Sequence, residues 1–109
     1  MGPGPLGLNY NLQEVAGLLN IKTGVFSLSA GESISLDIGC GYIFMYDYGS
    51  YYYGNFEIPY WESTIIKLNG NITNTITLSK EVSSCKFTIT AKANNQFRVA
   101  VKYVFIGVK

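Results

Sequence analysis

The chain has 109 residues, the size of one domain, and it is long enough to bury a core without help from a disulfide or a metal ion. Hydrophobic residues make up 48% of the chain and charged residues 14%, a composition that excludes a disordered protein. The formal net charge of +1 gives no electrostatic reason to expect nucleic acid as a partner. The longest apolar run has the length of a strand, so we also expect no membrane insertion.

The first twenty residues divide into a lead-in and a helix. Residues 1–9 are rich in Gly and Pro, which predicts a flexible lead-in or a tag. Asn11 then has the features of a helix N-cap, with Glu14 in the capping-box position and Asn20 as the closing residue. Helical spacing relates Leu12, Val15, Ala16 and Leu19. We therefore expect one short N-terminal helix at the start of a single domain over residues 10–109.

From Val25 onward the hydrophobic pattern alternates as in β-strands. Residues 25–29 and 33–38 flank a Gly31 turn and predict a hairpin. Residues 42–48 are apolar on both faces, which predicts a central strand that is covered on both sides, with Tyr42, Phe44 and Tyr46 in the core. Asn69-Gly70 is the strongest hairpin signal in the chain, because both central residues of a type I′ turn need positive φ.

The last two predicted strands are the most regular. Residues 85–92 alternate between a buried and a wet face. Residues 97–108 place Phe97 and Val99 on one face, but Val104, Ile106 and Val108 make the opposite face apolar too. The N-terminal helix or a neighbouring subunit would have to cover that second face. Together the segments predict an all-β fold, an antiparallel, jelly-roll-like β-sandwich of about seven or eight strands with one short N-terminal helix.

Charge is distributed unevenly along the chain. Six of the seven acidic residues lie within 1–66, whereas seven of the eight Lys and Arg residues lie within 67–109. Two explanations remain open: neighbouring strands of opposite sign within one domain, or a head-to-side contact between identical subunits.

Cys40 and Cys85 could pair, but both lie in apolar, strand-like contexts, where a free cysteine packs as a small hydrophobe. Residues 1–9 also lack the basic and apolar regions of a signal peptide. We therefore expect reduced, buried thiols in a protein made in a cytoplasm.

The absence of histidine removes the Ser-His-Asp triad, the Cys-His pair and the usual transition-metal sites, and no motif calls for a cofactor. A glycosidase-type carboxylate pair among Asp47, Glu57 and Glu62 stays formally possible. Acidic residues at turns and strand ends are usually solvated, however, so we do not expect an enzyme.

The aromatic segment over residues 42–61 is the feature most suggestive of function. No single face can bury the three consecutive rings of Tyr51, Tyr52 and Tyr53, so at least one must meet solvent, a ligand or another chain. Rings that stack on a pyranose, together with carboxylates and amides that bond its hydroxyls, are typical of a saccharide site. The candidate ligand-binding residues are Asp47, Tyr51, Tyr52, Tyr53, Asn55 and Trp61. The alternative is that these aromatics pack at a subunit interface.

The layout of this chain resembles the C-terminal receptor-binding tip domains of bacteriophage tail fibres and related virion adhesion proteins. The resemblance rests on the leucine-rich segment 11–19, the segment 24–36, the Thr- and Asn-rich residues 72–77 and the closing strand 97–108. It implies a β-sandwich that forms a homotrimer at the tip of a virion tail fibre and binds a host cell-surface glycan without catalysis. A structural virion subunit whose aromatic loop mediates homo-oligomerisation is the alternative function.

Overall fold

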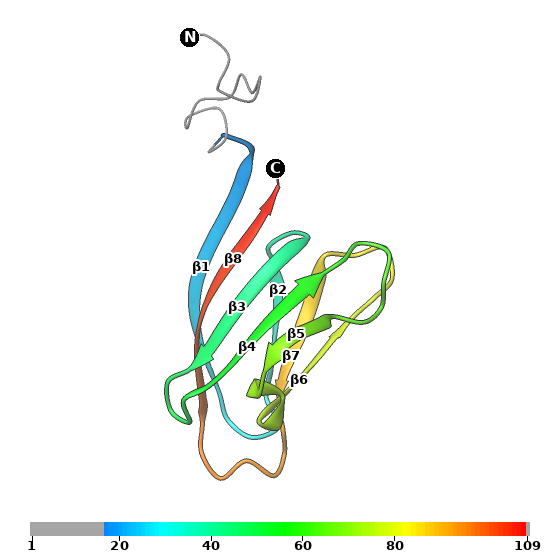
Figure 1. Ribbon diagram of the computed structural model, residues 1–109. Coiled ribbons are helices and arrows are strands. Elements are labelled where there is room, and N and C mark those ends of the chain that lie inside the picture. Colours follow the sequence, from blue (N-terminus) through cyan, green and yellow to red (C-terminus); the bar gives the residue numbers. More distant parts are fainter. Residues whose placement is uncertain (1–16, 109) are drawn as a thin grey trace, which may run out of the picture.

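The computed structural model describes residues 17–108, which form eight strands and one 3-10 turn in two antiparallel sheets (Figure 1). The lead-in 1–9 and the predicted helix up to Ala16 lie outside the described residues. Leu19 and Asn20, which the sequence assigns to the end of that helix, instead begin the first strand, so this part of the prediction is wrong.

The larger sheet has five strands in the order β1-β8-β3-β4-β5. These strands are β1 (Leu19–Leu28), β8 (Val99–Val108), β3 (Gly41–Asp47), β4 (Tyr52–Ile58) and β5 (Ile66–Gly70). The first and last strands of the chain pair along ten residues, from Leu19 opposite Val108 to Leu28 opposite Val99. The predicted central strand is therefore confirmed as β3, the middle strand of this sheet.

The smaller sheet has three strands in the order β2-β7-β6. They are β2 (Ser33–Asp37), β7 (Lys86–Ala91) and β6 (Ile76–Lys80), and the 3-10 turn η1 (Ile72–Asn74) leads into β6. Asp37 lies opposite Lys86 in the β2–β7 register, so part of the uneven charge is paired between neighbouring strands.

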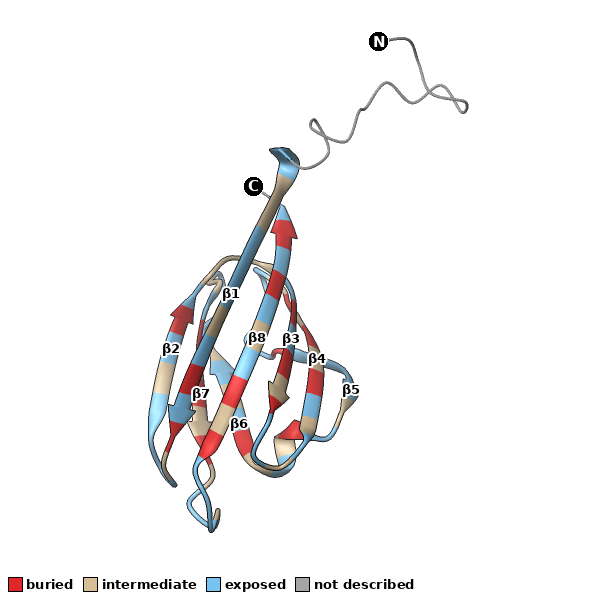
Figure 2. Cartoon of the chain, turned by 90° about the vertical axis from the view of Figure 1, so that its left-hand side faces the viewer, coloured by how far each residue is buried: buried red, intermediate tan, exposed pale blue. Residues whose placement is uncertain are grey.

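The two sheets pack face to face over one core. Alternate residues of each strand point inward, so that buried and exposed positions follow one another along β8 and β3 (Figure 2). Phe87, Ile89 and Ala91 of β7 are almost fully buried, as their alternation predicts. They meet inward side chains of the larger sheet, including Phe26, Ile43, Met45, Phe56, Val101 and Phe105.

The opposite face of β3 is a correction to the sequence analysis. Ile43 and Met45 fill the core, whereas Tyr42 and Phe44 are 55% and 40% exposed. Tyr46, on the same side of β3, is half-buried and also lies outside the core cluster. The Tyr42 and Phe44 rings point away from the smaller sheet, and no described part of the chain covers them.

Two predicted hairpins are also wrong. The Gly31 turn does not return β2 alongside β1, because β1 pairs with β8 in one sheet and β2 with β7 in the other. The chain crosses between the sheets there through a tight turn, in which Glu32 N donates to Ser29 O over 2.9 Å and Gly31 has φ +83°. Likewise, β5 and β6 lie in different sheets, and η1 carries the chain between them.

The φ angle of Gly70 is positive, at +105°, as the type I′ turn predicted from Asn69-Gly70 would require. No hairpin turn forms here, however, so the positive φ has another cause. A Cβ at Gly70 would meet the Tyr53 carbonyl of the adjoining strand, so glycine permits the close approach of β5 to β4. The glycine therefore serves strand pairing instead of a hairpin turn.

The cysteines form a disulfide, so the expectation of reduced thiols is wrong. Cys40 precedes β3 and Cys85 precedes β7, and their Cα atoms are 5.1 Å apart, within the range that a disulfide spans. Both residues sit in connections at one end of the sandwich and are only half-buried, because β3 and β7 each begin one residue after the cysteine. The bond ties the larger sheet to the smaller one.

Within residues 17–108, no helix has both the length and the apolar character needed to cross a membrane.

Candidate functional site

The six residues predicted to bind a ligand lie in three separate places. Asp47, Tyr51 and Tyr52 belong to the β3–β4 connection at one end of the sandwich. Tyr53 and Asn55 point outward from β4, on the face of the larger sheet that turns away from the core. Trp61 lies beyond the other end of β4, roughly 20 Å away at the usual rise of a strand. The predicted site is therefore not one site.

A hollow lies at the β3–β4 end of the sandwich. This end cleft has a volume of about 670 Å³ and is lined by three segments, 47–52, 74–75 and 94–99. Figure 1 shows the β3–β4 connection, η1 and the β7–β8 connection together at the lower end of the molecule. Of the predicted ligand-binding residues, Asp47 and Tyr52 line this cleft.

Asp47 shapes the β3–β4 wall of the end cleft. Its side chain is 2% exposed, and Oδ1 accepts hydrogen bonds from the backbone N–H groups of Gly49 at 3.0 Å, Ser50 at 3.4 Å and Ala100 at 3.4 Å. Oδ2 accepts the Ser50 hydroxyl at 2.8 Å. These hydrogen bonds fix the shape of the β3–β4 connection and hold it against β8. Both carboxylate oxygens of Asp47 are therefore already used in hydrogen bonds within the protein.

The connection brings the tyrosines to different environments. Tyr51 has φ +64° and its side chain is 75% exposed at the tip. Tyr52 is half-buried and packs against the core from the cleft wall. Tyr53 turns to the outer sheet face, where its ring centre lies 6.5 Å from that of Phe44. The three adjacent rings therefore lie in three different environments, as expected because no single face can bury three consecutive side chains.

The β7–β8 connection forms the opposite wall, and the sequence analysis missed it. Asn95 Nδ2 donates to the Thr75 carbonyl at 2.8 Å, which holds this connection against the start of β6. Phe97 is 80% exposed although it lines the cleft, and Gln96 beside it is exposed as well. The signal was present in the sequence as an apolar ring that follows a run of amides, Asn94-Asn95-Gln96.

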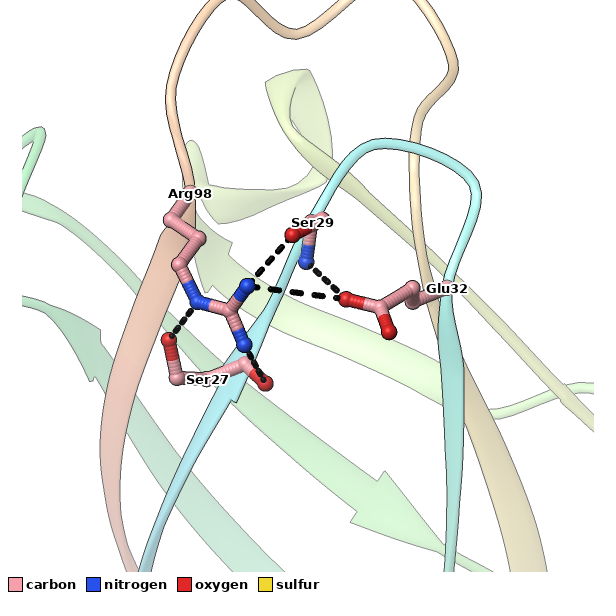
Figure 3. Close-up of polar contacts among 4 residues, drawn as sticks. All are labelled: Ser27, Ser29, Glu32 and Arg98. Carbon is pink, nitrogen blue, oxygen red and sulfur yellow. Dashed lines mark hydrogen bonds and ion pairs between the residues drawn. The ribbon is translucent and has the colours of Figure 1, made fainter.

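Arg98 lines the cleft but directs its guanidinium elsewhere (Figure 3). Its Nε donates to the Ser27 hydroxyl at 2.7 Å, Nη2 to the Ser27 carbonyl at 3.3 Å, and Nη1 to the Ser29 hydroxyl. Nη1 also lies 3.8 Å from a Glu32 carboxylate oxygen. Arg98 therefore clamps β8 to the β1–β2 connection.

Glu32 completes this clamp. Its Oε1 accepts the Ser29 backbone N–H at 2.6 Å. That hydrogen bond, with the Ser29 side chain and the nearby Arg98 charge, lowers the pKa of the exposed Glu32 carboxyl below its ordinary value.

The carboxylates weighed for catalysis do not converge. Asp47 points into the core at the cleft end of β3, whereas Glu57 points outward opposite Tyr42, at the other end of that strand. Glu62 lies in the β4–β5 connection. Among residues 17–108, no group of three or more His, Cys, Asp and Glu side chains is gathered closely enough to hold a metal ion.

The end cleft is thus polar yet without a free charge. Its charged lining residues are Asp47 and Arg98, and both are engaged within the protein. What remains toward the cleft is a set of amide and hydroxyl groups, with the rings of Tyr52 and Phe97. Such a surface can exchange hydrogen bonds with a neutral polyhydroxylated molecule and stack on its apolar face. No protein-family model, no curated protein and no solved structure matches this chain.

Proposed function

We propose that this protein is a non-catalytic adhesion module, of the kind carried at the tip of a phage tail fibre, that recognises a host-surface saccharide in the end cleft. The observation that carries this proposal is the 80% exposure of Phe97 in a cleft lined by amides. An exposed ring costs solvation free energy unless a ligand covers it, and pyranose rings present a matching apolar face.

The ligand in this proposal is a neutral saccharide. An anionic sugar would need an unpaired cation, but the Arg98 guanidinium is bound to Ser27, Ser29 and Glu32. The Asp47 oxygens accept hydrogen bonds from the protein itself. The amides of Asn74, Asn94 and Gln96, by contrast, both donate and accept, as sugar hydroxyls require.

The test is binding of the full chain to an array of neutral and acidic glycans, followed by titration of the strongest ligand. Phe97→Ala is expected to weaken binding about two- to tenfold, which corresponds to loss of one stacking contact of about 0.5–1.5 kcal/mol. Trp61→Ala is the matched control, because Trp61 is a comparably exposed ring, 72% accessible, at the opposite end of β4.

The outcomes are distinct. Binding that Phe97→Ala weakens and Trp61→Ala leaves unchanged supports the end cleft. Preference for acidic glycans would overturn the neutral ligand class but keep the adhesion function. The absence of binding to any glycan would overturn the function itself.

The proposal includes a jelly-roll-like connectivity for the sandwich. Its support is the nested pairing, in which β1 lies next to β8 and β2 next to β7, with β3 on the other side of β8. The strands β4 and β5 follow β3 in the order of the larger sheet.

A structural assembly subunit is the second candidate function. It is favoured by exposed aromatic side chains outside the end cleft, such as Tyr42 and Phe44. A chain that binds no glycan but assembles into particles or fibres would support this second function.

A further inference from the structure

The outer face of the larger sheet is apolar over four adjacent strands. Side chains at alternate positions of β1, β8, β3 and β4 point away from the core. Figure 2 shows the exposed positions of β8 between its buried ones. Six of them define the outer patch, and each is between 40% and 56% exposed: Ile21, Tyr42, Phe44, Tyr53, Val104 and Ile106.

The strand register makes the outer patch continuous. Ile106 lies between Ile21 on one side and Tyr42 on the other, and Val104 lies beside Phe44. The Phe44 and Tyr53 rings are in turn 6.5 Å apart. Tyr42, Phe44, Val104 and Ile106, together with Leu68 of β5, surround a hollow of about 130 Å³, which is the kind of depression that an anchoring side chain fills.

The area exposed is too large for an ordinary free surface. At about 150–250 Å² for a large side chain, the outer patch with its apolar neighbours on β1, β5 and β8 presents on the order of 1,000 Å². The largest apolar patch on a typical monomer is about 300–600 Å², whereas a stable interface buries about 800 Å² from each partner. The six residues of the outer patch alone present about 400–700 Å², and together with these neighbours they reach about the size of one half of an interface.

The predicted N-terminal helix is too small to cover it. A helix over residues 11–18 would be about 12 Å long and about 10 Å wide. Five strands at about 4.8 Å spacing make the face about 19 Å across. A structure that shields this face from solvent must extend across all five strands.

The charges on the face favour a second copy of the same chain. Lys102 points outward from β8 beside Tyr46, and Glu57 points outward from β4 beside Tyr42. These two residues flank Phe44 diagonally, on opposite sides of β3. A two-fold axis that lies in the plane of the interface, passes through Phe44 and runs perpendicular to the line from Lys102 to Glu57 would place each Lys102 against Glu57 of the partner subunit.

We propose that the outer patch is an interface between copies of this chain, with Phe44 at its centre. The inference does not depend on saccharide binding, since the end cleft and the outer patch use different residues. Of the three consecutive tyrosines, only Tyr53 belongs to the outer patch, because Tyr51 stands at the tip of the sandwich and Tyr52 lines the end cleft.

The experiment is the solution mass of the full chain by light scattering. We expect twice the 12.0 kDa chain mass, and a mass of three chains would contradict the two-fold arrangement. We also expect Phe44→Lys to raise the dissociation constant about thirtyfold or more, as for a hot-spot residue. Tyr51→Lys is the matched control, because it adds the same charge at an exposed tyrosine away from the outer patch.

Circular dichroism of Phe44→Lys checks that the fold persists, since the side chain points away from the core. A monomeric wild-type chain would overturn the proposal. So would an oligomer that survives Phe44→Lys but dissociates in Tyr51→Lys. We expect Lys102→Glu to weaken association, and we expect the same of Glu57→Lys. Combining the two substitutions is expected to restore association, because the opposite charges face each other again. A double variant that associates more weakly than either single variant would contradict the two-fold arrangement.

Discussion

At the scale of single residues, Asp47 shows how a buried acid serves a site without touching its ligand. Its carboxylate gathers hydrogen bonds from Gly49, Ser50 and Ala100, so one side chain sets the shape of the β3–β4 wall and its distance from β8. A buried carboxylate is tolerated because these donors replace water. The end cleft therefore depends on Asp47 as a positioning residue.

We predict that Asp47→Ala lowers the free energy of unfolding by about 1–3 kcal/mol, because the N–H groups of Gly49 and Ala100 lose their acceptor. Urea denaturation of both proteins measures this difference. Asp37→Ala is the control, since Asp37 is exposed on β2, and its effect is expected to be about 0.5 kcal/mol or less. Equal effects of the two substitutions would contradict the role given to Asp47.

At the scale of elements, the β1–β2 connection is fixed by polar contacts that substitute for a hairpin ladder. β1 and β2 do not pair, so the turn is held instead by Glu32, Ser29 and Arg98 (Figure 3). Arg98 directly precedes β8, so the clamp also fixes where the larger sheet ends beside the end cleft.

This connection predicts a pH dependence. The pKa of Glu32 is lowered in the folded protein, so its ionised form contributes stability that is complete above the ordinary value of 4.5 and is lost as the pH falls through the lowered value. Wild type is therefore expected to be more stable than Glu32→Gln at pH 7, and the difference is expected to vanish in acid. Urea midpoints at pH 7 and pH 3 measure it. An unchanged difference at the two pH values would contradict the prediction.

The elements also show what the sequence could and could not predict. The alternation of Phe87, Ile89 and Ala91 identifies a half-buried strand, because burial repeats every second residue. The pattern around Gly31 does not distinguish a hairpin from a crossing between sheets, since in both cases the two strands bury one face in the same core. In the short apolar run from Tyr42 to Tyr46, no polar position marks the outer face, so the assignment of Tyr42 and Phe44 to the core failed.

The candidate site was predictable only in part. Asp47 and Tyr52 lie only five residues apart and face each other across the β3–β4 pair, so a local aromatic cluster indicated them. Phe97 was predicted to share a strand face with Val99, which is buried, but β8 begins only at Val99 and Phe97 is exposed. The wall that Phe97 forms depends on the meeting of connections far apart in the chain, which no local pattern contains.

At the scale of the whole molecule, the Cys40–Cys85 disulfide joins the two sheets at the end opposite the cleft. It closes a loop with a sequence separation of 45, which restricts the unfolded chain more than the folded one.

We predict that replacing both cysteines with serine lowers the free energy of unfolding by about 2–4 kcal/mol, the usual contribution of a disulfide that closes a long loop. Urea denaturation of the oxidised wild type and the double variant measures the loss. Wild type treated with a reducing agent serves as the control and is expected to match the variant. A thiol titration that finds two free cysteines in the untreated protein would contradict the disulfide itself.

The ten-residue ladder between β1 and β8 has a practical consequence for protein engineering. Leu19 and Val108 face each other across the ladder, about 5 Å apart, while the end cleft lies about 30 Å away beyond Leu28 and Val99. A domain whose N- and C-terminal ends lie close together can be inserted into a surface loop of an unrelated protein without separating the two ends of that loop. Residues 19–108 could therefore be displayed on a carrier protein as an insertion, with the cleft held at the far tip.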